Sequence, residues 1–154
     1  MKKTVPRLAA IAGTLAALAL IGSALGCSER AERVPAQAQS ALERGKYLAD
    51  GVAGCYDCHT PRLPTGEPDR TRWLQGAPLF FAPVQPIPGW VATAPAIAGG
   101  PAGWSEEQLV SFLESGLKPG GVQPAPPMPA FRLSHDDAVA VAAYLRSLAA
   151  VPAK

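Results

Sequence analysis

The chain has 154 residues, which is enough for one modest domain after an export signal is removed. Charged residues make up 17% of it and apolar residues 48%, and no block of basic residues occurs outside the extreme N-terminus. This composition excludes an intrinsically disordered polymer and a nucleic-acid binder. The 17 prolines and 15 glycines predict that much of the chain is loop.

Residues 1–26 have the composition of a bacterial signal peptide. Three basic residues open it (Lys2, Lys3 and Arg7), and residues 8–25 follow without a charge. Ala24-Leu25-Gly26 then places small residues at the two positions that a signal peptidase inspects. Because Cys27 follows directly, the pattern resembles the lipobox of lipoproteins and predicts lipidation of Cys27. Two alternatives stay open: a cleaved signal that leaves a soluble protein, and an uncleaved anchor close to the minimum spanning length.

Residues 27–40 show no apolar periodicity and are rich in Ala, Gln, Ser and Glu, which predicts a flexible tether. The domain itself is expected at residues 41–150, and residues 151–154 form a short tail. We therefore expect a domain held by lipid on the periplasmic side of a bacterial membrane, with a soluble periplasmic protein as the alternative.

Three helix starts share a serine followed three residues later by an acid or amide: Ser40 with Glu43, Ser105 with Gln108, and Ser134 with Asp137. Apolar or small residues recur at helical spacing behind each: Leu42, Gly45, Leu48, Ala49 and Val52; Leu109, Phe112 and Leu113, ending at Gly116; and Ala138, Val141, Leu145 and Leu148. Gly45 and Ala49 are small enough to let the first and last helices cross closely.

Residues 60–103 show no strong period and contain nine prolines, which predicts a long ordered loop around something functional. No alternating strand pattern or internal repeat occurs. The predicted fold is therefore all-α, with three or more helices and long Pro/Gly-rich loops.

Cys55-Tyr56-Asp57-Cys58-His59 is the C-x-x-C-H signature of covalent haem attachment. Two thiols on one helical turn can each add to a haem vinyl group, and the next residue then faces the iron. We therefore predict one haem c, bound through Cys55 and Cys58, with His59 as an axial iron ligand. A zinc site would need further ligands, for which only Cys27 and His135 are available. A thioredoxin-like redox pair would need a βαβ context that the sequence lacks.

The sixth iron ligand is predicted by elimination. Apart from His59 and the initiator, the candidates are Met128, His135 or an open position. Met128 stands among prolines that stiffen the backbone, where it has little freedom to act as an adaptable core residue. His135 falls in the first turn of the last helix beside two Asp residues, a setting typical of a solvated histidine. Met128 is thus the predicted ligand.

With these residues placed, the chain resembles the class I cytochrome c family over about residues 41–150. The matching motifs are Arg44-Gly45-Lys46-Tyr47-Leu48, C-x-x-C-H, Met128-Pro129-Ala130-Phe131 and Tyr144-Leu145-Arg146-Ser147-Leu148. The Cys55–Pro61 and Gly103–Leu109 stretches also look like the cytochrome subunits that accompany bacterial membrane dehydrogenases. The resemblance implies a cytochrome c-like fold with crossed terminal helices, His/Met-ligated iron, and periplasmic electron transfer.

The expected function is single-electron transfer between donor and acceptor proteins, with no catalysis and no small-molecule substrate. The alternatives are a subunit of a larger membrane-associated dehydrogenase or oxidase, and a haem enzyme or gas sensor with an open sixth site. Six further residues are candidates for contacts with the haem or its propionates: Arg62, Arg70, Arg72, Trp73, Trp90 and Trp104. A proline carbonyl commonly orients the axial histidine in this family, and Pro64 and Pro68 are the candidates.

Overall fold

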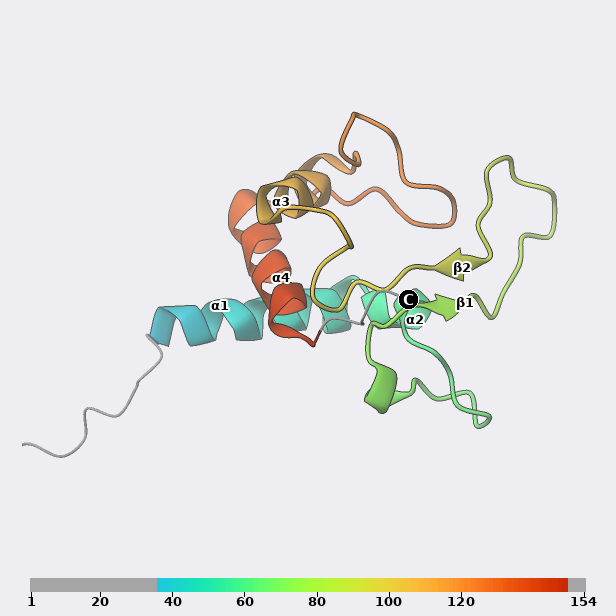
Figure 1. Cartoon of the computed structure of the whole chain (residues 1–154), viewed down its shortest axis with the longest axis horizontal. Coiled ribbons are helices and arrows are strands. Elements are labelled where there is room, and N and C mark those ends of the chain that lie inside the picture. Colours follow the sequence, from blue (N-terminus) through green and yellow to red (C-terminus); the bar gives the residue numbers. More distant parts are fainter. Residues whose placement is uncertain (1–35, 150–154) are drawn as a thin grey trace, which may run out of the picture. The chain divides into compact units, whose positions relative to one another are not determined.

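The structure, a computed structural model, describes residues 36–149, with side chains from Ser40 onward (Figure 1). Its helical elements are α1 (Ala36–Lys46), the π-helix η1 (Tyr47–Val52), α2 (Cys55–His59), the 3-10 helix η2 (Arg70–Arg72), α3 (Glu106–Ser115) and α4 (His135–Ser147). The predictions for residues 1–26, Cys27 and residues 151–154 lie outside the described residues. None of the helices in the described part has the length and apolar content that a membrane crossing requires.

The largely helical architecture confirms the predicted fold class, with one addition. Two short strands, β1 (Ala77–Pro78) and β2 (Thr93–Ala94), pair antiparallel, with Ala77 opposite Ala94. The sequence did not predict them, because two-residue strands are too short to show an alternating pattern. They close a long loop that brings residues 93–98 back beside residues 74–77.

The predicted start of the first helix at Ser40 is wrong, because α1 already begins at Ala36. The last residues of the predicted tether are therefore helical. Ala and Gln, which fill these positions, are good helix formers, so the helix extends past the serine that resembled a cap. The predicted apolar stripe holds for Leu48 and Ala49, which are buried. Val52 is 61% exposed, because the wider turn of η1 rotates it away from the core.

Helices α1 and α4 cross closely at Gly45, as the sequence predicted. A Cβ atom at this position would overlap the carbonyl group of Ala140 in α4 and would lie 2.9 Å from Tyr144 Cβ. Only glycine lets the two backbones approach so far. At the edge of the crossing, Arg44 Nε donates to Asp137 Oδ1 at 2.9 Å.

The caps of α3 and α4 confirm the other two predicted helix starts. Ser105 Oγ accepts from the Gln108 backbone N–H at 3.2 Å, and the Gln108 side chain accepts from the Ser105 N–H at 2.9 Å. Ser134 Oγ accepts from the Asp137 N–H at 3.3 Å. Gly116 ends α3 with φ of 72°, a left-handed conformation that favours glycine. These caps satisfy backbone donors that a helix end leaves unpaired.

One hydrophobic core joins the helices to the long loop. Its buried residues from η1, α3 and α4 include Leu48, Ala49, Leu109, Val110, Phe112, Leu113, Ala138, Val141, Tyr144 and Leu145. Leu74, from the loop, is completely buried in the same core and has a positive φ of 56°. Its backbone N–H donates to Thr60 Oγ1 at 2.9 Å, and its carbonyl accepts from the Ile97 N–H at 2.9 Å. The loop after α2 is therefore fixed to the core at Leu74.

A polar network connects the α1–η1 segment, the loop and α4. The Tyr144 hydroxyl donates to Asp50 Oδ2 at 3.0 Å, and the indole N–H of Trp73 donates to the Tyr144 hydroxyl at 3.3 Å. Lys46 Nζ also donates to Asp50 Oδ2, at 2.6 Å. Trp73 in turn stacks on Tyr56, with ring centroids 5.0 Å apart. The network thus ties the C-x-x-C-H turn to the helix crossing.

Candidate haem-binding site

Helix α2 presents Cys55, Cys58 and His59 on a little more than one helical turn. Gly54 precedes the helix with φ of 60°, which reverses the chain after η1, and its carbonyl accepts from the Asp57 N–H at 3.0 Å. After His59 the backbone becomes extended at Thr60. The three-residue spacing of Cys55 and Cys58 places both on the same side of α2.

The four predicted haem residues line one cavity of about 360 Å³. Cys55, Cys58 and His59 come from α2, whereas Met128 comes from the loop between α3 and α4. This volume lies in the range of small-molecule and cofactor sites. The rest of the lining is mainly apolar and includes Leu79, Val91, Ile97, Trp104, Leu109, Phe112, Leu113, Phe131, Val141 and Leu145. The cavity therefore suits an apolar group that is reached by two thiols, an imidazole and a thioether.

A backbone carbonyl fixes the orientation of the His59 ring. Nδ1 lies 2.7 Å from the Pro95 oxygen, and because a carbonyl only accepts, Nδ1 carries the proton and Nε2 keeps its lone pair. His59 is 5% exposed. Burial lowers the pKa of His59, although the hydrogen bond to Pro95 partly opposes this. The ring is thus held in the neutral form that coordinates iron.

The two proline candidates for this contact, Pro64 and Pro68, are wrong, and Pro95 provides the carbonyl. The antiparallel pair β1–β2 returns residues 93–98 toward α2, and the Gly76 N–H donates to the His59 carbonyl at 2.7 Å. The approach is tight, since a Cβ atom at Gly76 would lie 2.7 Å from the Ala96 nitrogen. No sequence spacing signals this contact, because it depends on a pairing only two residues long.

The protein environment keeps the free thiols protonated. Burial raises the pKa of Cys55 to about 11, and the nearby Asp50 carboxylate acts in the same direction. The pKa of Cys58 is also raised, chiefly by burial and then by Asp57. Both groups are therefore thiols near neutral pH, the form that adds as S–H across a vinyl group.

Two backbone hydrogen bonds hold the segment that leads into Met128. The Met128 N–H donates to the Ala125 carbonyl at 3.1 Å, and the Pro126 carbonyl accepts from the Val91 N–H at 2.9 Å. His135, the alternative ligand, is exposed, pairs with Glu114 at 2.9 Å and does not line the cavity. Of the two residues predicted as candidates for the sixth iron ligand, Met128 is the one that lines the cavity.

None of the three arginines proposed for the propionates lines the cavity. Arg62 donates to Asp57 at 3.1 Å, Arg72 donates to Asp69 at 2.7 Å, and Arg70 lies over the Trp73 ring. Instead, Lys118 is the one Lys or Arg among the described lining residues. No motif in the sequence indicated that Lys118, which follows α3 by a few residues, would line the cavity.

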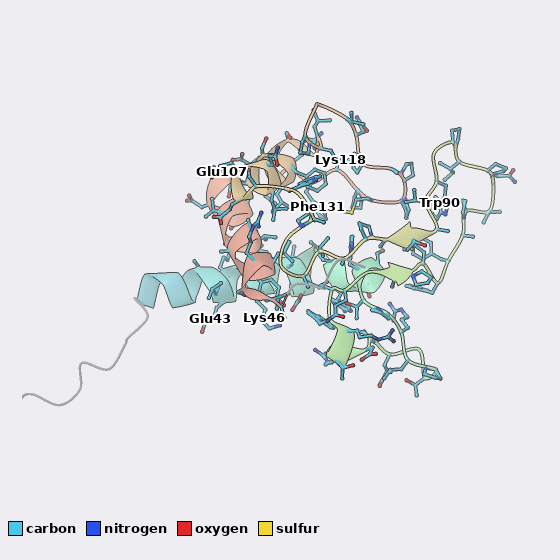
Figure 2. The ribbon with its side chains drawn as sticks, in the orientation of Figure 1. Glu43, Lys46, Trp90, Glu107, Lys118 and Phe131 are labelled. Carbon is cyan, nitrogen blue, oxygen red and sulfur yellow. The ribbon has the colours of Figure 1, made fainter. Side chains whose placement is uncertain are left out.

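Of the three tryptophans, Trp104 lines the cavity and packs edge-on against Phe112, with ring centroids 5.3 Å apart. Trp90 packs edge-on against Phe81. Figure 2 labels Trp90 on the loop between β1 and β2, and Lys118 and Phe131 on the loop between α3 and α4. In the described part of the chain, no group of three or more His, Cys, Asp and Glu side chains is arranged to hold a bare metal ion.

The haem-attachment turn and Met128 line the same apolar cavity, and this cavity lies beside the crossed helices. Together these features define a c-type cytochrome site. The family model for cytochrome c matches residues 42–149, and the chain belongs to the cytochrome c family. A cytochrome c domain implies a covalently bound haem c and a role in electron transfer.

Three curated relatives illustrate the similarity. A diheme cytochrome c-type protein of Cereibacter sphaeroides is 34% identical over 114 residues, which cover 71% of this chain and 36% of the relative. The cytochrome c subunit of the quinone alcohol dehydrogenase of Gluconobacter oxydans is 35% identical, over 72% of this chain and 24% of the subunit. The cytochrome c subunit of gluconate 2-dehydrogenase from Pantoea cypripedii is 36% identical, over 75% and 28%. The chain thus spans about a quarter to a third of the length of these relatives.

Proposed function

We propose that the protein is a monohaem c-type cytochrome that carries single electrons between redox protein partners. The observation that carries this proposal is the single apolar cavity lined by Cys55, Cys58, His59 and Met128. The chain contains one C-x-x-C-H motif, which supports one haem.

Each of the four residues has a distinct role in this proposal. Cys55 and Cys58 would hold a haem through thioether bonds, and His59 Nε2 and the Met128 sulfur would be the two protein ligands of its iron. The bound haem supplies an iron that alternates between the ferric and ferrous states. The soft Met128 sulfur favours the ferrous state, and the apolar lining acts in the same direction by excluding water.

The surroundings of the ligands support rapid electron exchange. The Pro95 carbonyl orients the His59 ring and makes its free nitrogen a better donor. The prolines next to Met128 restrict the backbone, so the ligand keeps its position in both oxidation states. Lys118, which lines the cavity, would balance the negative charge of a haem propionate. Little in the site has to rearrange when an electron arrives or leaves.

The assembly is proposed from the relatives. Several carry the names of cytochrome subunits of dehydrogenases, including a fructose dehydrogenase. We propose that this chain exchanges electrons with such a partner on the periplasmic side of a bacterial membrane, to which lipidated Cys27 tethers it. Co-purification with a dehydrogenase would support a stable subunit, whereas a haem protein isolated alone would support a freely exchanging carrier.

The first experiment is a visible spectrum of the full chain produced with a haem-maturation system. We expect one covalent haem per chain, and the weak sulfur-to-iron band of Met-ligated ferric haem at the red end of the spectrum. That band should be lost in Met128→Ala and kept in His135→Ala, the matched control. If the band is missing from the unmodified protein, or persists in Met128→Ala, Met128 is not the ligand. A high-spin haem that binds CO freely would favour the enzyme or sensor function, and a chain without covalent haem would refute the proposal.

A further inference from the structure

One stretch beside the cavity has an unusual surface. Residues 73–105 contain no charged side chain. Of the twelve large hydrophobic side chains that are exposed in the described part of the chain, five lie within residues 80–91. We call these five the apolar patch: Phe80, Phe81, Val84, Ile87 and Val91. Val84 is 97% exposed and Phe80 61%. Exposed apolar side chains gathered on one loop in this way mark interaction sites on soluble proteins.

The loop that carries the patch keeps these side chains exposed. Its prolines at positions 83, 86 and 88 fix the backbone φ angles, so the loop cannot easily fold its own apolar groups together. At its base Phe81 packs edge-on against Trp90, with ring centroids 5.8 Å apart. Figure 1 shows this loop as one wide turn between β1 and β2, away from α1, α3 and α4. The patch is therefore presented in a preformed shape.

The patch is continuous with the cavity that binds the haem. Leu79, which precedes it, and Val91, its last member, both line that cavity. Phe80 lies against the guanidinium group of Arg62, with 4.1 Å between the guanidinium carbon and the ring centroid. Arg62 also donates to Asp57, inside the C-x-x-C-H turn. A molecule seated on the patch would therefore lie next to both the haem-attachment turn and the cavity wall.

We propose that the apolar patch is the docking surface for a redox partner protein that presents an uncharged, apolar face. The inference rests on the proposed function, because single-electron exchange requires the partner to lie close to the haem. Phe side chains suit the centre of such an interface, and electron-transfer complexes bury less than about 1,200 Å² in total. The partner is a protein rather than a membrane surface, since binding to anionic lipid uses clustered Lys and Arg, which residues 73–105 lack.

The absence of charge leads to a measurable property. A complex steered by opposite charges loses association rate steeply as salt rises, since the Debye length falls from about 30 Å at 0.01 M to about 3 Å at 1 M. The charge that touches the patch, the Arg62 guanidinium against Phe80, is paired with the Asp57 carboxylate. Docking through the patch should therefore depend little on salt. We accordingly expect this protein to exchange electrons fastest with a surface that is apolar and carries no charge.

The test measures electron exchange of the haem-loaded full chain at gold electrodes covered with alkanethiol monolayers that end in methyl, carboxylate or ammonium groups. We expect the fastest exchange on the methyl surface, with little change between low and high salt. Val84→Lys should slow that exchange at least tenfold. Val139→Lys, the same substitution at a 37% exposed site on α4 that does not line the cavity, should leave it unchanged. Neither substitution should alter the ligand band of the visible spectrum.

Several results would overturn the proposal. Exchange that is fastest on a charged monolayer, or that is indifferent to Val84→Lys, means that the patch does not dock the partner. If Val84→Lys, but not Val139→Lys, converts a dimer to a monomer in sedimentation, a second copy of this chain occupies the patch. If it abolishes binding to phosphatidylcholine vesicles, the occupant is a lipid surface. Failure of the proposed function is distinguishable, because the electrode would then show no haem wave in any variant, or the visible spectrum would show a high-spin haem that binds CO.

Discussion

Replacing Gly45 by Ala should destabilise the protein, although alanine is the better helix former. The new Cβ atom would meet the Ala140 carbonyl carbon at 2.5 Å and Tyr144 Cβ at 2.9 Å, against a favourable carbon–carbon separation of about 3.5–4.0 Å. Because the nearest atoms belong to a helix backbone, they cannot move aside by a rotamer change. Helices α1 and α4 would have to separate by roughly 1 Å.

The magnitude follows from two opposing terms. Glycine to alanine inside a helix gains about 1 kcal/mol in helix propensity. Overpacking a well-packed contact costs about 1–3 kcal/mol, and contact with backbone places Gly45→Ala at the upper end of that range. We therefore expect a net loss of about 2 kcal/mol in the free energy of unfolding, or roughly 8 °C in Tm for a domain of this size.

The assay is denaturant unfolding of the haem-loaded protein, followed by far-ultraviolet circular dichroism. Gly51→Ala is the matched control, since Gly51 lies in η1 and an added Cβ would meet only the Tyr47 ring at 3.4 Å. This variant should be as stable as the unmodified protein, or up to about 1 kcal/mol more stable. If Gly45→Ala proves equally stable, the close crossing of α1 and α4 does not depend on glycine and the reasoning fails.

Three further predictions concern single side chains. Lys118→Gln should lower the midpoint potential of the haem, because a cation beside the haem favours the ferrous state. Lys118→Arg keeps the charge and should keep the potential. Equal potentials in the unmodified protein and both variants would place Lys118 away from the haem. Tyr144→Phe should cost about 1–2 kcal/mol in denaturant unfolding, since Asp50 and Trp73 each lose a hydrogen-bond partner; an unchanged midpoint would mean that the network is not stabilising. Hydrogen bonds hold the pKa of Asp69 at about 2, so its contribution to stability is complete above about pH 4 and lost as pH falls toward 2. Unfolding free energies measured across that window should fall less in Asp69→Asn, and an identical acid profile would contradict this account.

The sequence alone determined the features that depend on local chemistry. The C-x-x-C-H spacing predicted two thiols and an imidazole on one helical turn, because the period of a helix fixes which neighbours share a face. The serine caps at Ser105 and Ser134 and the stop at Gly116 were likewise predictable, since each satisfies backbone groups within a few residues. Met128 was predicted as the sixth ligand by elimination among few candidates, and the structure places it in the lining of the cavity.

Only the tertiary structure decided the contacts that join distant parts of the chain. The hydrogen bond from His59 to Pro95 depends on a strand pairing of two residues, which leaves no periodic signal. Lys118, rather than an arginine near the haem-attachment turn, lines the cavity because the loop after α3 passes beside it. The sequence placed the residues of the apolar patch in an ordered loop. It did not predict that their side chains are exposed beside the cavity. Local patterns encode which groups are present and how each turn closes, whereas packing against the core decides which of them meet.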